Sequence, residues 1–368
     1  MPHIQLNSVK ISGFAGSSGE PGQTIKVLIR GGMTSNEPLF HKVMAGISSL
    51  AAPKFPQSQI NHLLLIVHRD NSADLYLNDF EIHGEMMLKK SVREGEAVFR
   101  SDIADWRRIR FPKINLTSTD KVVVCCKIGW KFALFFDFNP DGELKIDELE
   151  IGIARLFRYL TFEECYATLS NEDAKNSLIK EGWFPFVELL GDQFDRLAIS
   201  YSAGFSVSGA HEPILSSFDN SRIERLKERW RNSTTLGDRI EILSAGLDSY
   251  IRKEPIPCLK IMLTEIEGIL REIRKKDTGE SDGKLPVLLD YICNRGLTKI
   301  GDEASLLFPK EFREYLASVT FQNFDPASVS IAPISRHSAG HGASPASAYT
   351  MERALQAILT VDQIAFFL

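Results

Sequence analysis

The sequence predicts an α+β protein, with a β-rich sandwich or barrel-like domain first and helices after it. Short apolar runs bounded by turn residues occupy residues 1–135, and near Asp137 the apolar spacing changes from a strand period to a helical one. The rest of the chain keeps the helical period. A chain of 368 residues, 43% hydrophobic and 25% charged, is typical of a globular protein with two or three domains.

Four runs of β-branched or alternating residues predict the strands of the first domain. Turn-forming residues border them, and we expect no long amphipathic helix between them, which is typical of an antiparallel sandwich or barrel. This domain, whose role the sequence does not indicate, is expected to span residues 1–135. The predicted strands are 24–30, 62–68, 73–78 and 121–127.

An apolar stripe with helical spacing begins at Ile146 and continues to Leu160. We therefore expect an acidic, mostly helical connecting region over 136–215 and a helical domain over 216–368. Residues 136–195 hold 14 acidic and 5 basic residues, a net charge of −9, so the other residues of this −5 chain sum to +4. A nucleic acid would bind outside the acidic stretch, because its phosphates need basic partners.

Two helices of the C-terminal domain have the strongest pattern. The first is expected over 258–276, with one apolar stripe and basic residues in its last turn, where the helix dipole favours them. The second is expected from Met351 to about Phe367. Its apolar end predicts docking into the core.

Cysteine use and hydropathy indicate the compartment. The five cysteines include no CxxC pair, so they predict neither a disulfide framework nor a zinc site. No run of eighteen apolar residues occurs, and the first residues lack a basic stretch followed by an apolar one. We expect a cytoplasmic protein with no membrane partner.

Residues 137–148 match the spacing of a calcium-binding loop. Asp137, Asn139 and Asp141 take loop positions 1, 3 and 5, Gly142 takes position 6, and Glu148 takes position 12. A strand rather than a helix is expected to enter the loop, and no second loop is present to pair with it. We therefore favour a plain strand-to-helix turn, with these four side chains as weak metal candidates and no metal or other cofactor expected.

Arg336 and His341 form the other candidate site. A guanidinium group binds phosphoryl oxygens in a bidentate manner, and an imidazole titrates near neutral pH, so the pair can hold a phosphate and move a proton. Pro333 is expected to open a short helix here and Gly342 to close it. The alternative is a capped helix end with two surface histidines, His337 and His341.

The segment from Arg336 to His341 resembles the Arg-x4–6-His motif of the HEPN superfamily (higher eukaryotes and prokaryotes nucleotide-binding). In that motif a polar residue often follows the arginine, and His337 fills this place. The wider frame resembles uncharacterised bacterial proteins of this type over roughly residues 180–368. It comprises Glu181-Gly-Trp183-Phe-Pro185-Phe, Trp230, Glu265-Ile-Glu267-Gly-Ile-Leu270, Gly342 and Asp362-Gln363.

The resemblance implies an all-α HEPN-like helical bundle that often dimerises and brings two motifs together. It also implies a metal-independent ribonuclease of toxin, abortive-infection or other antiviral defence systems. Arg336 would then stabilise the phosphate charge and His341 would act as general acid or base, with His337 beside them. Glu267 is the expected partner of the site, although a glutamate four residues before Arg271 also suits an ordinary helix ion pair.

We therefore expect a dimeric RNase of bacterial defence or stress, with RNA as substrate and an antitoxin or defence-system protein as a further partner. Two alternatives remain at this point. One is an inactive HEPN-like module that binds RNA or a nucleotide. The other is a cation-responsive interaction protein that uses the 137–148 loop.

Overall fold

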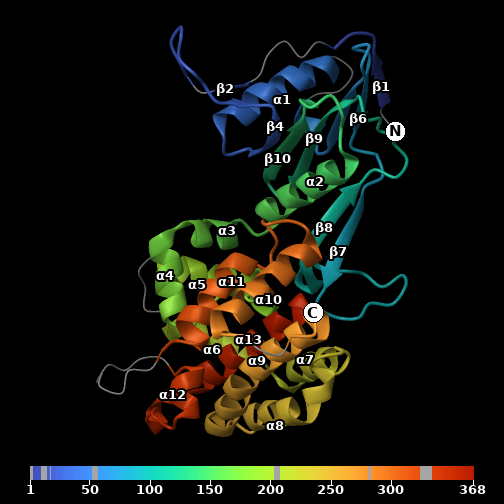
Figure 1. Cartoon of the computed structure of the whole chain (residues 1–368). Coiled ribbons are helices and arrows are strands. Elements are labelled where there is room, and N and C mark those ends of the chain that lie inside the picture. The colour runs from blue at the N-terminus through green and yellow to red at the C-terminus, as the bar shows by residue number, and fades with distance from the viewer. Residues whose placement is uncertain are drawn as a thin grey trace. The chain divides into compact units, whose positions relative to one another are not determined.

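The computed structural model describes residues 3–9, 15–16, 18–51, 57–202, 208–280, 283–323 and 334–368. It confirms a mixed α/β protein with an antiparallel sheet in the N-terminal half and helices in the C-terminal half (Figure 1). The chain divides into two compact units. Unit 1 comprises Met1–Met87 and Trp106–Thr161, and unit 2 comprises Leu88–Asp105 and Phe162–Leu368.

Unit 1 is built on a six-stranded antiparallel sheet with the strand order β1-β6-β5-β9-β10-β4. In its centre Leu65 pairs with Leu75 on one side and Val123 on the other. Three of the expected strands, in 62–68, 73–78 and 121–127, are confirmed. The strands are β1 (His3–Leu6), β4 (Arg30–Thr34), β5 (Leu63–Val67), β6 (Ala73–Leu77), β9 (Lys121–Ile128) and β10 (Lys131–Asp137).

Both faces of this sheet are covered by a helix, so the expected sandwich or barrel is wrong. Alternate residues of β5 belong to different cores, and all five are buried. Helix α1 (Pro38–Ala51) packs on one face through Phe40, Met44 and Ile47. Helix α2 (Ile146–Thr161) packs on the other face through its apolar stripe. A strand that is apolar at every position fits this arrangement, because neither of its faces meets water.

Two small antiparallel pairs complete the strands. Strand β2 (Ala15–Gly16) pairs with β3 (Val27–Leu28), and β7 (His83–Leu88) pairs with β8 (Ile103–Arg110). The predicted strand over 24–30 is therefore divided between β3 and the start of β4. The connection between β7 and β8 belongs to unit 2, although the chain around it belongs to unit 1.

Unit 2 is helical. Its described helices are α3 (Glu163–Ser170), α4 (Glu172–Lys180), α5 (Asp192–Ser202), α6 (Ser208–Ser217), α7 (Asn220–Arg231), α8 (Ile240–Ile251), α9 (Pro255–Thr278), α10 (Leu285–Ile300), α11 (Pro309–Tyr315), α12 (Arg336–Gly340) and α13 (Met351–Phe367). Short helical turns lie at Arg100–Asp102, Val187–Leu189, Gly237–Arg239, Leu316–Thr320 and Ala346–Ala348. A further turn, Gln57–Gln59, lies in unit 1. Helices α9 and α13 match the two strongest sequence predictions.

Helix α13 forms the centre of unit 2, as its apolar sequence predicts. Its residues from Ala354 to Ile364 are all buried, and α9 and α10 pack against it. Several of these buried positions are polar, and each finds a partner. Gln363, for example, accepts from the backbone N–H of Val187 at 2.9 Å and donates to the carbonyl of Leu307 at 3.0 Å.

The two units divide the chain differently from the expected ranges 1–135, 136–215 and 216–368. Helix α2 belongs to unit 1, because its apolar stripe packs on the sheet. The helices that follow it belong to unit 2. There Phe184 packs on Phe312 and Phe186 on Tyr315, with ring centres 5.4 Å apart in each pair. The acidic stretch is thus shared between two cores and forms no compact region of its own.

All five cysteines lie in the described part of the chain, and each is a buried free thiol. Burial raises the pKa of Cys125 to about 12 and, with the neighbouring Cys125, also that of Cys126 above its ordinary value. Across the described ranges, no helix combines the length and apolarity needed to cross a membrane.

Candidate functional site

Helix α12 presents the predicted Arg-His motif. Ser335 caps its N-terminus, because its hydroxyl accepts from Ser338 N and its own N–H donates to Ser338 Oγ at 2.9 Å. At the other end His341 is the C-cap, and Gly342 follows with a φ of +67°, a conformation that favours glycine. Gly342 thus closes the helix as predicted, while Pro333 lies outside the described residues.

Arg336 contacts Glu267, the residue expected as a partner of the site. Arg336 Nη2 lies 2.8 Å from Glu267 Oε2, across the contact between α12 and α9. The other carboxylate oxygen, Oε1, accepts from Arg271 Nη2 at 2.8 Å, which is the i,i+4 helix pair that was the alternative. Glu267 therefore pairs with both arginines, and this group of three side chains has a net charge of +1.

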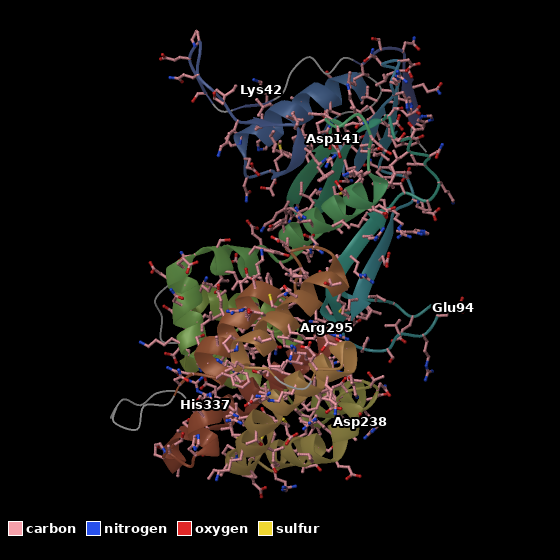
Figure 2. The ribbon with its side chains drawn as sticks, in the orientation of Figure 1. Lys42, Glu94, Asp141, Asp238, Arg295 and His337 are labelled. Atoms are coloured by element: carbon pink, nitrogen blue, oxygen red, sulfur yellow. The ribbon has the colours of Figure 1, made fainter. Side chains whose placement is uncertain are left out.

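The two histidines lie on the same short segment as Arg336. His337 is half-buried in the last turn of α12 (Figure 2), and His341 is exposed. Within the described residues, neither imidazole makes a hydrogen bond or an ion pair. Both rings are therefore free to accept or donate a proton to a bound molecule.

Arg336 retains hydrogen-bonding capacity beyond its ion pair. Its side chain is 32% exposed. A guanidinium group has five N–H donors, and the ion pair with Glu267 is made through Nη2. Its Nε is buried and has no hydrogen-bond partner among the described residues. The segment thus carries an arginine held by a carboxylate and two imidazoles that make no hydrogen bond or ion pair with a described residue.

An arginine from another strand pairs with the carboxylates of the calcium-like loop. Arg30 of β4 lies 2.7 Å from Asp137, 3.5 Å from Asp141 and 3.0 Å from Glu148, measured between guanidinium nitrogen and carboxylate oxygen. Asn139 donates its amide to the carbonyls of Ser118 and Asp120. The four weak metal candidates are thus used to tie the turn, part of which Figure 2 marks at Asp141.

We expect calcium to leave the stability of unit 1 unchanged, because the Arg30 guanidinium neutralises the carboxylates that an ion would need. If the loop did bind calcium in the folded state alone, a hundredfold excess over Kd would add about 2.7 kcal/mol. Melting curves with millimolar calcium and with EDTA measure the difference. A rise of several degrees that disappears in Glu148→Gln would identify a real cation site.

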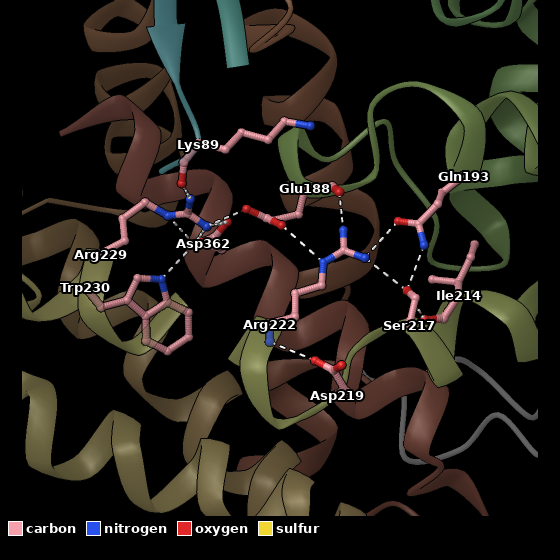
Figure 3. A network of polar contacts seen from close by, with 10 residues as sticks. All are labelled: Lys89, Glu188, Gln193, Ile214, Ser217, Asp219, Arg222, Arg229, Trp230 and Asp362. Carbon is pink, nitrogen blue, oxygen red and sulfur yellow. Dashed lines mark hydrogen bonds and ion pairs between the residues drawn. The ribbon is translucent and has the colours of Figure 1, made fainter. Parts of the chain in front are cut away.

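Unit 2 also contains a buried polar network that was not predicted from the sequence. Figure 3 shows Glu188 between two arginines of α7. Arg229 Nη2 donates to Glu188 Oε1 at 2.7 Å and to Asp362 Oδ2 at 2.8 Å, and Trp230 Nε1 donates to Asp362 Oδ1 at 2.8 Å. Arg222 donates to the backbone carbonyl of Glu188 and lies 3.3 Å from its carboxylate.

The charges of the network act on one another strongly. Burial raises the pKa of Glu188, but the nearby Arg229, Arg222 and Lys89 outweigh it, so the pKa of this carboxyl is lowered overall. Burial also raises the pKa of Asp362, and there the Glu188 charge adds to the effect, while Arg229 opposes it. The network therefore holds two buried carboxylates through two arginines, and Lys89 acts on Glu188 only through its charge.

One sequence signal could have indicated this network. Arg222 and Arg229 are seven residues apart on a helix, so they lie on the same face, and a basic pair on a face with buried residues needs acidic partners. Trp230 and Asp362, which belong to the frame of the resemblance, prove to be in contact. Their observed contribution is to hold α7 and α13 together.

No described group of three or more histidine, cysteine, aspartate or glutamate side chains is placed to hold a metal ion. Comparisons of the chain with protein-family models, with curated proteins and with solved structures find no match.

Proposed function

We propose that this protein is a metal-independent endoribonuclease of the HEPN type. The observation that carries the proposal is the contact between Arg336 and Glu267, two residues 69 positions apart, on the same short segment as the unpartnered imidazoles of His337 and His341. An arginine kept in place next to a free imidazole is suited to phosphate chemistry, because one group binds the phosphoryl oxygens and the other moves the proton.

In the proposed reaction the ribose 2′-hydroxyl attacks the adjacent phosphorus. His341 takes the hydroxyl proton or protonates the departing 5′ oxygen, and Arg336 stabilises the charge that grows on the phosphoryl oxygens. Glu267 keeps Arg336 in position. The new bond to the 2′ oxygen and the loss of the 5′ oxygen leave a 2′,3′-cyclic phosphate.

The proposal includes a homodimer, since one motif gives a single Arg-His pair and two chains would supply a second. It also includes a role in bacterial anti-phage defence or a toxin-like stress response, with an antitoxin or defence-system protein as partner. The helical unit 2 is proposed as the HEPN-like bundle, and the role of unit 1 stays open.

We expect cleavage of single-stranded RNA in EDTA, and we expect Arg336→Ala to slow it by about 10²–10³-fold, the usual cost of losing one donor to a developing oxyanion. A DNA strand of the same sequence should resist, because it lacks the attacking 2′-hydroxyl. The measurement is the rate of product formation, with mass spectrometry to identify the cyclic phosphate.

Arg271→Ala is the matched control. It removes the other guanidinium from the same carboxylate, in a half-exposed i,i+4 helix ion pair of a kind that contributes roughly 0–1 kcal/mol to stability. Equal losses in both variants would show that only the placement of Glu267 matters. RNA that binds but is never cut would instead support the inactive binding module.

A further inference from the structure

A pocket in unit 2 lies apart from Arg336 and the two histidines and is lined by several basic residues. It has a volume of about 680 Å³, within the range of small-molecule sites, and lies where α7 meets the segment 88–91 and the end of α13. Its basic lining residues are Lys89, Lys90, Arg225 and Arg229, and Glu228 is the acidic one. The pocket therefore carries an excess of positive charge.

Lys89 is the least satisfied of these cations. Its carbonyl accepts from Arg229, as Figure 3 shows, but its ammonium group forms no hydrogen bond and no ion pair with any described residue. Burial lowers the pKa of Lys89 to about 8, and the charges of Arg222 and Arg229 act in the same direction against that of Glu188. The Lys89 ammonium therefore lies near two guanidinium groups, and the nearby carboxylate of Glu188 makes no ion pair with it.

The other cations differ in how freely they could meet a ligand. Arg225 is exposed and has no recorded partner in the described ranges, whereas Arg229 is fully used by Asp362 and Glu188. Lys90 lies 3.3 Å from Asp102 and 3.8 Å from Glu96. Lys89 and Arg225 are thus the two cations with donors to offer.

The same two residues also line an adjoining pocket of about 580 Å³, together with Lys90. Lys89 and Arg225 therefore line both pockets. On the larger pocket's other walls, Asn232, Ser233 and Thr234 add amide, hydroxyl and backbone groups. None of the described lining residues of either pocket is aromatic, so neither offers the stacking surface on which single-stranded RNA bases bind.

We propose that the larger pocket binds a small ligand carrying phosphate groups, with the Lys89 ammonium and the Arg225 guanidinium on the phosphate oxygens. An ammonium point charge and a planar guanidinium are the two groups that proteins use most for phosphate. The site does not include Arg336 or the histidines of α12, so it is a ligand site separate from the proposed ribonuclease centre.

Isothermal titration calorimetry with inorganic pyrophosphate, at fixed ionic strength, measures the binding affinity and tests the proposal. We expect saturable binding, weakened at least tenfold in both Lys89→Gln and Arg225→Gln. Arg231→Gln is the matched control, because it removes an exposed arginine of the same helix that does not line the pocket. Its affinity should equal that of the wild type. Orthophosphate in parallel shows whether one phosphate group suffices.

Lys89→Gln should also fold normally, because it removes an unpaired cation from beside two others, and its melting temperature checks this. RNA cleavage should continue in this variant, which separates this site from the proposed function. Absence of saturable binding, or an unchanged affinity in Lys89→Gln, would overturn the proposal. The proposal would also be overturned if a short RNA bound in a manner that depends on Lys89 and Arg225 while pyrophosphate did not bind.

Discussion

Asp362→Asn should lower the free energy of unfolding of unit 2 by about 3–5 kcal/mol, the usual cost of removing one partner from a buried ion pair. Asp362 is 1% exposed, and its carboxylate meets Arg229 and the indole N–H of Trp230. Without its charge, Glu188 alone faces Arg222, Arg229 and Lys89. Three cations would then share one carboxylate in a buried place.

Urea unfolding followed by circular dichroism at 222 nm measures this effect, because the signal comes mainly from the helices. Asp248→Asn is the control, since Asp248 pairs with Lys227 of the same helix α7 at 3.3 Å but is 46% exposed. An exposed pair contributes roughly 0–1 kcal/mol. Similar small losses in both variants would mean that the network adds little to stability.

Local patterns were sufficient for much of the fold. The strands in 62–68, 73–78 and 121–127 and the helices α9 and α13 follow from spacing alone, because each has a complete apolar pattern of its own. Helix α1 was missed, although Phe40, Met44 and Ile47 repeat at helical spacing. Its apolar stripe is short and lies among strands. A sandwich or barrel, in which strands cover strands, was therefore wrongly expected.

The layers of unit 1 depend on long-range packing that no short window contains. The uninterrupted apolar run Leu63–Val67 could have indicated a sheet buried on both faces, since a sandwich strand would alternate. Which helices cover those faces is decided by α1 and α2, which lie 94 residues apart from end to start. Packing likewise decides that residues 88–105 belong to unit 2, and the amino-acid composition of this segment does not indicate it.

The candidate site divides in the same way. The helix cap at Ser335 and the turn at Gly342 are local, and the position of Gly342 predicted the end of α12. Glu267 is expected as a partner of the site only through the resemblance, and its contact with Arg336 was not predicted, because two charged residues on different helices carry no pairing signal. The network around Glu188 had no such guide, and a buried glutamate cannot be told from an exposed one by its neighbours in sequence.

His341→Ala should slow RNA cleavage by about 10²–10⁴-fold, the range that a positioned acid or base contributes. Its stability should change by no more than about 0.5 kcal/mol, because the side chain is exposed and makes no described hydrogen bond. The backbone of His341, which donates to the carbonyl of His337 at 3.1 Å, is unaffected by the substitution. Loss of activity would then be chemical rather than structural.

Cleavage rates and melting temperatures of the same preparations decide the matter, with His83→Ala as the control for an exposed histidine of unit 1. His337→Ala should lose less activity than His341→Ala. The resemblance gives His337 the place of the polar residue after the arginine, and it gives the proton transfer to His341. Full activity in His341→Ala would remove the catalytic assignment. If His337→Ala were instead the inactive variant, the imidazole in the last turn of α12 would be the proton carrier, with Arg336 still on Glu267 as its phosphate-binding partner.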